Sequence, residues 1–463
     1  MKVCIINGSP RGEYSVTLHS CLYLQKVFPE HQFDFLNVGI KIKALERDFS
    51  EAITKLQEAD FLIFSYPVYT FIAPSQLHRF IELIKENNIN LKEKFVSQIT
   101  TSKHFYDITA HNFIEDNCHD LQMKFVKGLS QDMEDLTKEF GQNDLKKFFN
   151  YLVYCYNNDI YEKKEKVPFK LKDYKYSKLS NLEKDSSKKI VIVADLNKED
   201  KQYHGLSNMI DHFIDLVKYK VEVVNLRDFP FKGGCLGCFN CAGNGKCIYK
   251  DNFDEFLRNN IQTADGIVLA FNIKDHSMGA LFKMYDDRQF CNGHRTVTEG
   301  LPFGYLVNGN YEAESNLKMI VEGRAEVGHN FLAGVGYDQE TIKTMTERLV
   351  YAIDNQYLQP RNFYGVGGMK IFRDLIWIMR GLMKADHKFY KKHGVYDFPQ
   401  KQRGKMILMC FLGSLVRNPK IKAKMGNKFN EGMVAPYKKV LKKIEKEKIK
   451  WKYLYWKIDI FGV

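Results

Sequence analysis

The sequence predicts an α/β protein with two doubly wound parallel-sheet domains in tandem, followed by a basic and mostly helical C-terminal region. Three observations support this prediction. Short apolar runs alternate with amphipathic stretches from the first residues on, the same order starts again near residue 189, and the positive charge is concentrated at the end. A chain of 463 residues that is 44% hydrophobic and 14% aromatic can fill several cores, which excludes disordered and collagen-like proteins.

The first domain is expected to cover residues 1–156. Apolar runs of strand length alternate there with stretches of helical period, which is the pattern of a doubly wound sheet. The expected strands are 2–6, 32–37, 61–65, 94–100 and 125–129, and the expected helices are 15–27, 49–59, 75–84 and 144–156. The loops after the strands then meet at the carboxyl edge of the sheet, where ligands bind in such folds.

Residues 157–188 are polar and charged with little apolar periodicity, so they are expected to form a linker. The order of the first domain then returns, with expected strands at 189–193, 220–226, 263–271 and 301–308. This repeat predicts a second α/β domain over 189–356. One large sheet is the alternative, and it is disfavoured because about 350 residues exceed the usual size of a single core.

The loop after the first strand is a candidate phosphate site. It combines two glycines, three hydroxyls and one guanidinium with the N-terminus of a helix, where backbone N–H groups and the helix dipole favour anions. Its candidate ligands are Ser9, Arg11, Ser15, Val16 and Thr17. The loop contains neither G-x-G-x-x-G nor G-K-[ST]. An ordinary turn with Ser15 as helix N-cap is the alternative.

Two further loops follow strands and are expected at the same edge of the sheet. The loop over residues 66–74 is aromatic, so its side chains can flank a planar ring while its backbone amides bind the edge of that ring. The other loop covers residues 100–104. The candidate residues are Tyr66, Pro67, Val68, Tyr69 and Thr101. Packing without a ligand is the alternative for the aromatic loop.

These motifs resemble a known family. G-S-P-R-x₃-S-x-T after the first strand and Y-P-V-Y-x₄-P-S-x-L-x-R-F after the third are similar to the NAD(P)H-dependent FMN reductases of the flavodoxin-like superfamily, over about residues 1–130. The resemblance implies that the first loop binds the FMN phosphate and that the aromatic loop holds the isoalloxazine. It also implies hydride transfer from NAD(P)H, with the flavin supplying the chemistry.

Four cysteines crowd into a glycine-rich stretch of the second domain. Cys235, Cys238, Cys241 and Cys247 have the spacing C-x₂-C-x₂-C-x₅-C, and compact C-x₂-C-x₂-C spacing is used for iron–sulfur clusters. A 4Fe-4S cluster, a zinc site and a metal-free thiol loop are the alternatives. Residues 220–275 resemble the iron–sulfur flavoproteins and their cluster-free relatives.

The second domain departs from the family where FMN would bind. Its first loop carries Asp195, Glu199 and Asp200, which would repel a phosphate, and residues 272–278 replace the aromatic loop. We therefore expect FMN in the first domain only. The second domain would supply the cysteines, and the pair would imitate the dimer of single-domain relatives. His276 and His294 are expected to be solvated loop residues.

The C-terminal region over 357–463 is strongly basic. Residues 361–463 hold 25 lysines and arginines against 7 acidic residues, whereas the rest of the chain holds 44 against 49. Helices are expected at 369–387, 406–416 and 438–456. Basic amphipathic helices can lie on an anionic membrane surface, and packing against the α/β body is the alternative. No nucleic-acid-binding motif accompanies the charge.

The sequence thus predicts an oxidoreductase that uses FMN, with NAD(P)H as cosubstrate and a quinone, another small molecule or a protein as acceptor. A non-enzymatic flavin electron carrier and a membrane-associated binding module are the alternatives. The chain begins with a strand, without a signal peptide, and has no long apolar span, so we expect a cytoplasmic location that includes the inner face of the membrane. The sequence leaves the oligomeric state open.

Overall fold

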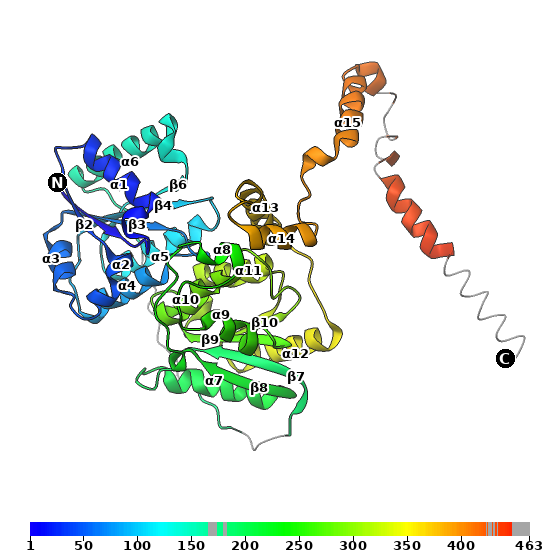
Figure 1. Ribbon diagram of the computed structural model, residues 1–463, viewed down its shortest axis with the longest axis horizontal. Helices are drawn as coiled ribbons and strands as arrows, with labels where there is room; N and C mark the ends of the chain where they lie inside the picture. Colours follow the sequence, from blue (N-terminus) through cyan, green and yellow to red (C-terminus); the bar gives the residue numbers. More distant parts are fainter. Residues whose placement is uncertain are drawn as a thin grey trace, which may run out of the picture. The chain divides into compact units, whose positions relative to one another are not determined.

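The computed structural model describes residues 1–164, 174–178, 183–422, 424, 428, 431–432 and 434–446 (Figure 1). The chain divides into two compact units, Met1–His393 and Gly394–Val463. The first unit contains both α/β domains, and the second contains the end of the basic region.

The first domain is a parallel sheet with the strand order β2-β1-β3-β4-β5, in which β6 also pairs with β4. This is the flavodoxin-like order, so the expected fold class is confirmed. Its strands are β1 (Lys2–Asn7), β2 (Gln32–Leu36), β3 (Phe61–Pro67), β4 (Phe95–Ser102), β5 (Lys124–Phe125) and β6 (Leu129–Asp132). Its α-helices are α1 (Val16–Val27), α2 (Val38–Leu45), α3 (Ser50–Glu58), α4 (Ser75–Glu86), α5 (Asp107–Asp120) and α6 (Glu139–Asn157).

The second domain repeats this topology as a parallel sheet with the order β11-β10-β9-β7-β8. Its strands are β7 (Asp185–Ala194), β8 (Tyr219–Asn225), β9 (Gly266–Asn272), β10 (Pro302–Asn308) and β11 (Phe331–Gly336). Its helices are α7 (Tyr203–Leu216), α8 (Asn240–Asn244), α9 (Phe253–Phe256) with a following π-turn, α10 (Gly279–Arg288), α11 (Ser315–Gly328) and α12 (Gln339–Asn355).

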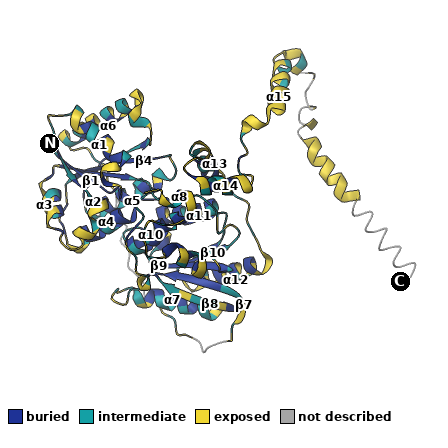
Figure 2. Ribbon diagram, viewed as in Figure 1, coloured by how far each residue is buried: buried dark blue, intermediate teal, exposed yellow. Residues whose placement is uncertain are grey.

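Each sheet has one face that only its own domain covers. Helices α1 and α6 cover that face of the first sheet, and α7 and α12 cover the corresponding face of the second (Figure 2). The other faces share one continuous hydrophobic core, to which both domains contribute, and α4 packs against α10. The two domains are therefore joined through a core and not by the linker alone.

An approximate two-fold relation governs this contact. The backbone N–H of Ser75 donates to Asp287 Oδ2 (2.8 Å), and the backbone N–H of Ala280 donates to Glu82 Oε1 (2.8 Å). Ser75 and Ala280 are 205 positions apart in the sequence, and so are Glu82 and Asp287. Each helix N-terminus is thus capped by a carboxylate of the other domain, where a negative charge is favoured. This exchange is what two copies of one domain produce when they pair like a dimer.

Several elements differ from the sequence prediction. Helices α2 and α5 were not expected, and α6 begins at Glu139 instead of residue 144. The expected strand 125–129 is split into β5 and β6, because the chain leaves the ladder between them. The expected linker lies partly outside the described residues, and β7 already begins at Asp185.

The basic region belongs to both compact units. Helices α13 (Phe363–Ile378) and α14 (Lys384–Lys392) lie in the first unit, where α13 packs on α11. Helix α15 (Arg403–Val416) lies in the second. The expected helix 438–456 is helical over 438–446, and its remainder lies outside the described residues. No helix in the described part of the chain is long and apolar enough to cross a bilayer.

Replacing Asp287 by alanine should destabilise the first unit. The change removes a helix cap and leaves the fully buried Lys283 with one carboxylate fewer, so we expect a loss of about 3 kcal/mol, typical of a broken buried ion pair. Urea unfolding followed by circular dichroism measures this loss. Glu86→Gln, which weakens a half-exposed ion pair with Arg79, is the matched control and should cost less than about 1 kcal/mol. Equal effects would contradict the assignment.

Candidate functional site

The loop after β1 folds into a compact turn around Ser9. This side chain is 1% exposed, and its Oγ accepts a hydrogen bond from the backbone N–H of Arg11 (3.3 Å). The Asn7 side chain accepts from the N–H of Ser9 (3.2 Å). Gly12 has φ +54°, a conformation that favours glycine. The guanidinium of Arg11 remains exposed above this turn.

Helix α1 begins directly behind the turn. Ser15 is its N-cap and accepts from the N–H of Leu18 (3.3 Å), so the alternative role considered for this residue is part of the structure. Val16 and Thr17 are the first two helical residues, and their N–H groups have no acceptor within the helix. The start of α1 therefore offers N–H donors beside the buried hydroxyl of Ser9.

The first and third loops meet through two hydroxyls. Thr17 Oγ1 and Thr101 Oγ1 are 2.6 Å apart, and both side chains are buried. Val68 of the aromatic loop donates its N–H to the carbonyl of Thr101 (3.3 Å). The structure thus brings residues of all three predicted loops together at the carboxyl edge of the first sheet.

The aromatic loop divides its side chains between the core and the edge. Tyr66 is fully buried and donates to Gln98 Oε1 (2.7 Å) or the Ala110 carbonyl (2.9 Å), so its ring faces the core. Pro67 and Val68 are half-buried. Tyr69 closes a tight turn with Ile72 through two backbone hydrogen bonds of 2.8 and 3.1 Å. Burial raises the pKa of Tyr69, and the nearby Cys235 thiol adds to this effect.

The cysteine loop of the second domain crosses this edge of the first domain. Gly237 has φ +60°, and a Cβ atom placed on it would lie 1.8 Å from the hydroxyl of Tyr69. The guanidinium carbon of Arg11 is 6.0 Å from the ring centroid of Phe239. Gln76 of α4 donates to the carbonyl of Cys235 (3.2 Å). The cysteine loop therefore contacts the first loop, the aromatic loop and helix α4 of the first domain.

Two thiols of this loop, those of Cys235 and Cys241, have separate hydrogen-bond partners. Cys235 Sγ accepts from the N–H of Gly237 (3.5 Å), and Cys241 Sγ donates to the carbonyl of Phe290 (3.1 Å). Burial raises the pKa of Cys235, and it raises the pKa of Cys241 to about 11. In the described residues, no three cysteine, histidine or acidic side chains form a group that could hold a metal ion. The metal assignment of Cys235, Cys238, Cys241 and Cys247 stays a prediction.

A buried lysine of α10, which the sequence analysis did not identify, holds the aromatic loop. Lys283 is fully buried and donates to the carbonyl of Tyr69 (3.0 Å) and to Thr70 Oγ1 (2.8 Å). It also pairs with Asp286 (3.3 Å) and with Asp287. The only sequence signal is the run Asp286-Asp287-Arg288 within a helix, one turn after Lys283.

A row of contacting aromatic side chains, which includes Phe372 of α13, links the two domains. Phe290 lies between Tyr69 and His294, with ring centroids 6.2 and 5.8 Å apart. Phe372 of α13 then contacts His294 (4.6 Å) and Phe105 (4.7 Å), which follows the third loop of the first domain. The His294 ring packs against Phe290 and Phe372, so the expectation of a solvated residue is wrong, and desolvation at this place lowers its pKa to about 4. The first part of the basic region thus packs on the α/β body.

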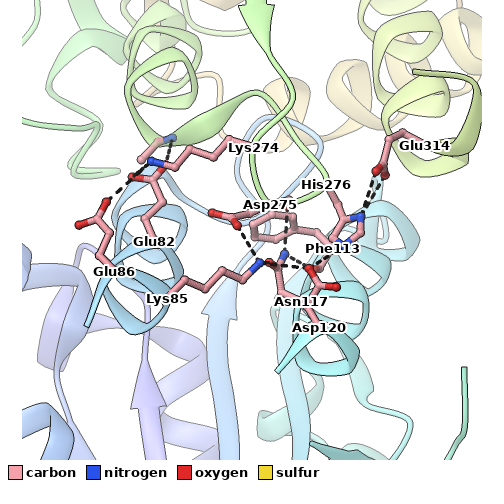
Figure 3. Close-up of polar contacts among 11 residues, drawn as sticks. Glu82, Lys85, Glu86, Phe113, Asn117, Asp120, Lys274, Asp275, His276 and Glu314 are labelled. Carbon is pink, nitrogen blue, oxygen red and sulfur yellow. Dashed lines mark hydrogen bonds and ion pairs between the residues drawn. The ribbon is translucent and has the colours of Figure 1, made fainter. Parts of the chain in front are cut away.

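The loop after β9 forms the same backbone turn as the aromatic loop after β3, but it carries different side chains. Lys274 and Ser277 form the same two backbone hydrogen bonds as Tyr69 and Ile72, again 205 positions apart. Charged side chains replace the aromatic ones and dock onto α4 and α5 of the first domain (Figure 3). Lys85 Nζ pairs with Asp275 (2.7 Å).

His276 is the centre of this docking contact. Its ring nitrogens lie 3.1 Å from Glu314 and 3.1 Å from Asp120 (Figure 3). Burial opposes the charged ring, but the hydrogen bonds to the two carboxylates outweigh it and raise the pKa to about 10. The expectation of a solvated histidine is therefore wrong here too. In the first loop of the same domain, Asp195 accepts from Arg227 Nε (2.7 Å).

Comparisons with known proteins agree with the resemblance of the first domain to the FMN reductases. Residues 1–126 match the family model of the NADPH-dependent FMN reductases. An iron–sulfur flavoprotein of Clostridioides difficile is 35% identical over 128 residues, which are 27% of this chain and 57% of that protein. The match thus spans less than two thirds of the relative's length. The resemblance inferred from the motifs is confirmed over the first domain.

Solved structures of similar proteins each cover about a third of the chain. One is an NADPH-quinone reductase of P. pentosaceus, with 15% identity, coverage of 33% of this chain and 97% of the other, and a TM-score of 0.27. Another is general stress protein 14 of Treponema denticola in complex with FMN, with 10% identity, coverage of 33% and 98%, and a TM-score of 0.28.

The His276 contact predicts a stability effect that depends on pH. Its pKa is raised from the usual value near 6.5, so its contribution is complete below about pH 6.5 and is lost as the pH rises through about 10. His276→Gln should therefore lower the urea midpoint most at pH 6 and least at pH 10. His104→Gln, at a half-exposed ion pair with Asp107, is the control and should change little at either pH. A pH-independent loss in His276→Gln would contradict the charge assignment.

Proposed function

We propose that the protein is an FMN-dependent NAD(P)H oxidoreductase with one flavin site, located in the first domain. One observation supports this most directly: the buried Ser9, the start of α1 and the Thr17–Thr101 hydroxyl pair converge at the carboxyl edge of the first sheet. The match to NADPH-dependent FMN reductases covers the same domain. The acceptor is proposed to be a quinone, another small molecule or a protein.

The residues present fit FMN. Its phosphate would be held by the N–H groups of Val16 and Thr17, the hydroxyls of Ser9 and Ser15, and the exposed guanidinium of Arg11. The backbone of Pro67 to Tyr69, with Thr101, would hold the isoalloxazine. When bound, FMN accepts a hydride from NAD(P)H and passes electrons to an acceptor.

The chain's own residues position and enclose the site. Lys283 donates to the carbonyl of Tyr69 and Asp287 accepts from the hydroxyl of Thr70, so the second domain would position the aromatic loop. The loop around Gly237 and the ring of Phe290 cover Tyr69 from the second domain. This cover would restrict water and select which acceptor reaches the site. Both domains are therefore needed for one site.

We propose no electron-transfer step through the four cysteines. The thiols of Cys235 and Cys241 bond to separate backbone groups, and in the described residues the four cysteines form no group that could hold a metal ion. The iron–sulfur alternative from the sequence is tested by assaying iron and acid-labile sulfide in anaerobically purified protein. About four of each per chain would support it, and none would leave the zinc site and the metal-free loop as the alternatives.

Arg11→Gln should weaken FMN binding without affecting the fold. The variant loses a charge-assisted contact to the phosphate, which is worth about 2 kcal/mol and corresponds to about a 30-fold higher dissociation constant. Fluorescence titration of the flavin-free protein with FMN measures it. Lys198→Gln, in the corresponding loop of the second domain, is the control and should bind FMN like the parent. The opposite result would place the flavin in the second domain.

Gly237→Ala should disturb the site from the second domain. The new methyl group would meet the Tyr69 hydroxyl and the backbone has φ +60°, so we expect at least a tenfold loss of FMN affinity or of quinone-dependent NAD(P)H oxidation. Gly243→Ala in the same loop has no atom within 4 Å of the new methyl group and serves as control. Equal activity of Gly237→Ala and the parent would show that the cysteine loop does not contribute to the site.

A further inference from the structure

Helix α15 of the second compact unit exposes apolar side chains all around its axis. Residues 406–412 are seven consecutive apolar residues, and at about 100° per residue they cover the whole circumference of the helix. Ile407 is 71% exposed and Phe411 is 61% exposed, and no residue of α15 is buried. A helix that packs on a protein surface needs only one apolar face, so this pattern calls for an apolar environment on several sides.

The charge around α15 has one sign. Residues 398–430 contain eight lysines and arginines and no acidic residue. These cations flank the apolar run on both sides, since Arg403 and Lys405 precede it and Arg417, Lys420 and Lys422 follow it. A second copy of this segment would bring like charges together, which disfavours a symmetric pairing of two α15 helices.

The length of the helix restricts the environment further. Fourteen residues extend about 21 Å, which is shorter than the roughly 30 Å hydrocarbon core of a bilayer. A helix of this length with cations at both ends matches the boundary between headgroups and acyl chains. There the apolar side chains enter the lipid while lysine and arginine side chains reach the phosphates.

We propose that α15 binds the surface of an anionic lipid bilayer by inserting its apolar residues between lipid headgroups. The flanking lysines and arginines bind the lipid phosphates. Helices α13 and α14 pack on the α/β body, so we assign lipid binding to the second compact unit alone. The proposal rests on α15 and its flanks and is independent of the flavin site.

Co-sedimentation of the full chain with vesicles tests the proposal. We expect binding to phosphatidylcholine vesicles that contain about 30% phosphatidylglycerol, and at least tenfold weaker binding to phosphatidylcholine alone or in 0.5 M salt. The double variant Leu408→Gln, Phe411→Gln should lose at least tenfold in binding. Ile378→Gln, at a 78% exposed apolar residue of α13, is the matched control and should bind like the parent.

Cysteine labelling tests the same insertion in the unmodified protein. Cys410 of α15 and Cys238 of the cysteine loop are both exposed. A charged maleimide, followed by peptide mass spectrometry, should modify Cys410 more slowly once anionic vesicles are added, while Cys238 reacts at an unchanged rate. This experiment does not depend on whether a variant folds.

Three results would overturn the proposal. Failure of the parent chain to sediment with anionic vesicles would do so directly. A Cys410 that is unreactive without lipid would show that the chain itself covers α15. A concentration-dependent dimer, measured by light scattering and abolished by the double variant, would assign α15 to a second copy if no vesicle binding accompanies it.

Discussion

The reciprocal packing of α4 against α10 is the contact on which the rest of the site depends. Each helix receives at its N-terminus a carboxylate from the other domain, Asp287 at Ser75 and Glu82 at Ala280. The same contact buries Lys283, which fixes the backbone of Tyr69. Because this exchange sets how the two sheets face each other, it also determines that the loop around Gly237 lies against the first domain.

The two domains share one backbone turn after the third strand of each sheet, but the side chains of the two turns have different roles. The turn of Tyr69 and the turn of Lys274 have matching hydrogen bonds and positive φ angles at their central residues. In the first domain the turn carries aromatic side chains beside hydroxyls and a helix N-terminus. In the second it carries charges that anchor it to α4 and α5. An aromatic turn suits a planar cofactor, whereas a charged turn stabilises the interface.

Much of the fold was predictable because it is local. Alternating apolar periods predicted five strands of the first domain and four of the second, without β11, and the loops after Asn7 and Thr100 meet as the topology requires. Contacts between distant segments were not predictable. The inward ring of Tyr66, the packing of His294 against Phe372 and the role of Lys283 depend on packing that composition does not encode. Short helices such as α2 were missed because their apolar residues fit no clear period.

The central claim is one flavin site per chain, built by both domains on the first sheet. The most direct test is the flavin content of the protein after saturation with FMN and removal of the excess, from the visible absorption spectrum and the protein concentration. One FMN per chain, which NAD(P)H reduces in the absence of oxygen, is the predicted result. Two per chain would mean that the charged second domain also binds flavin, and none would contradict the account.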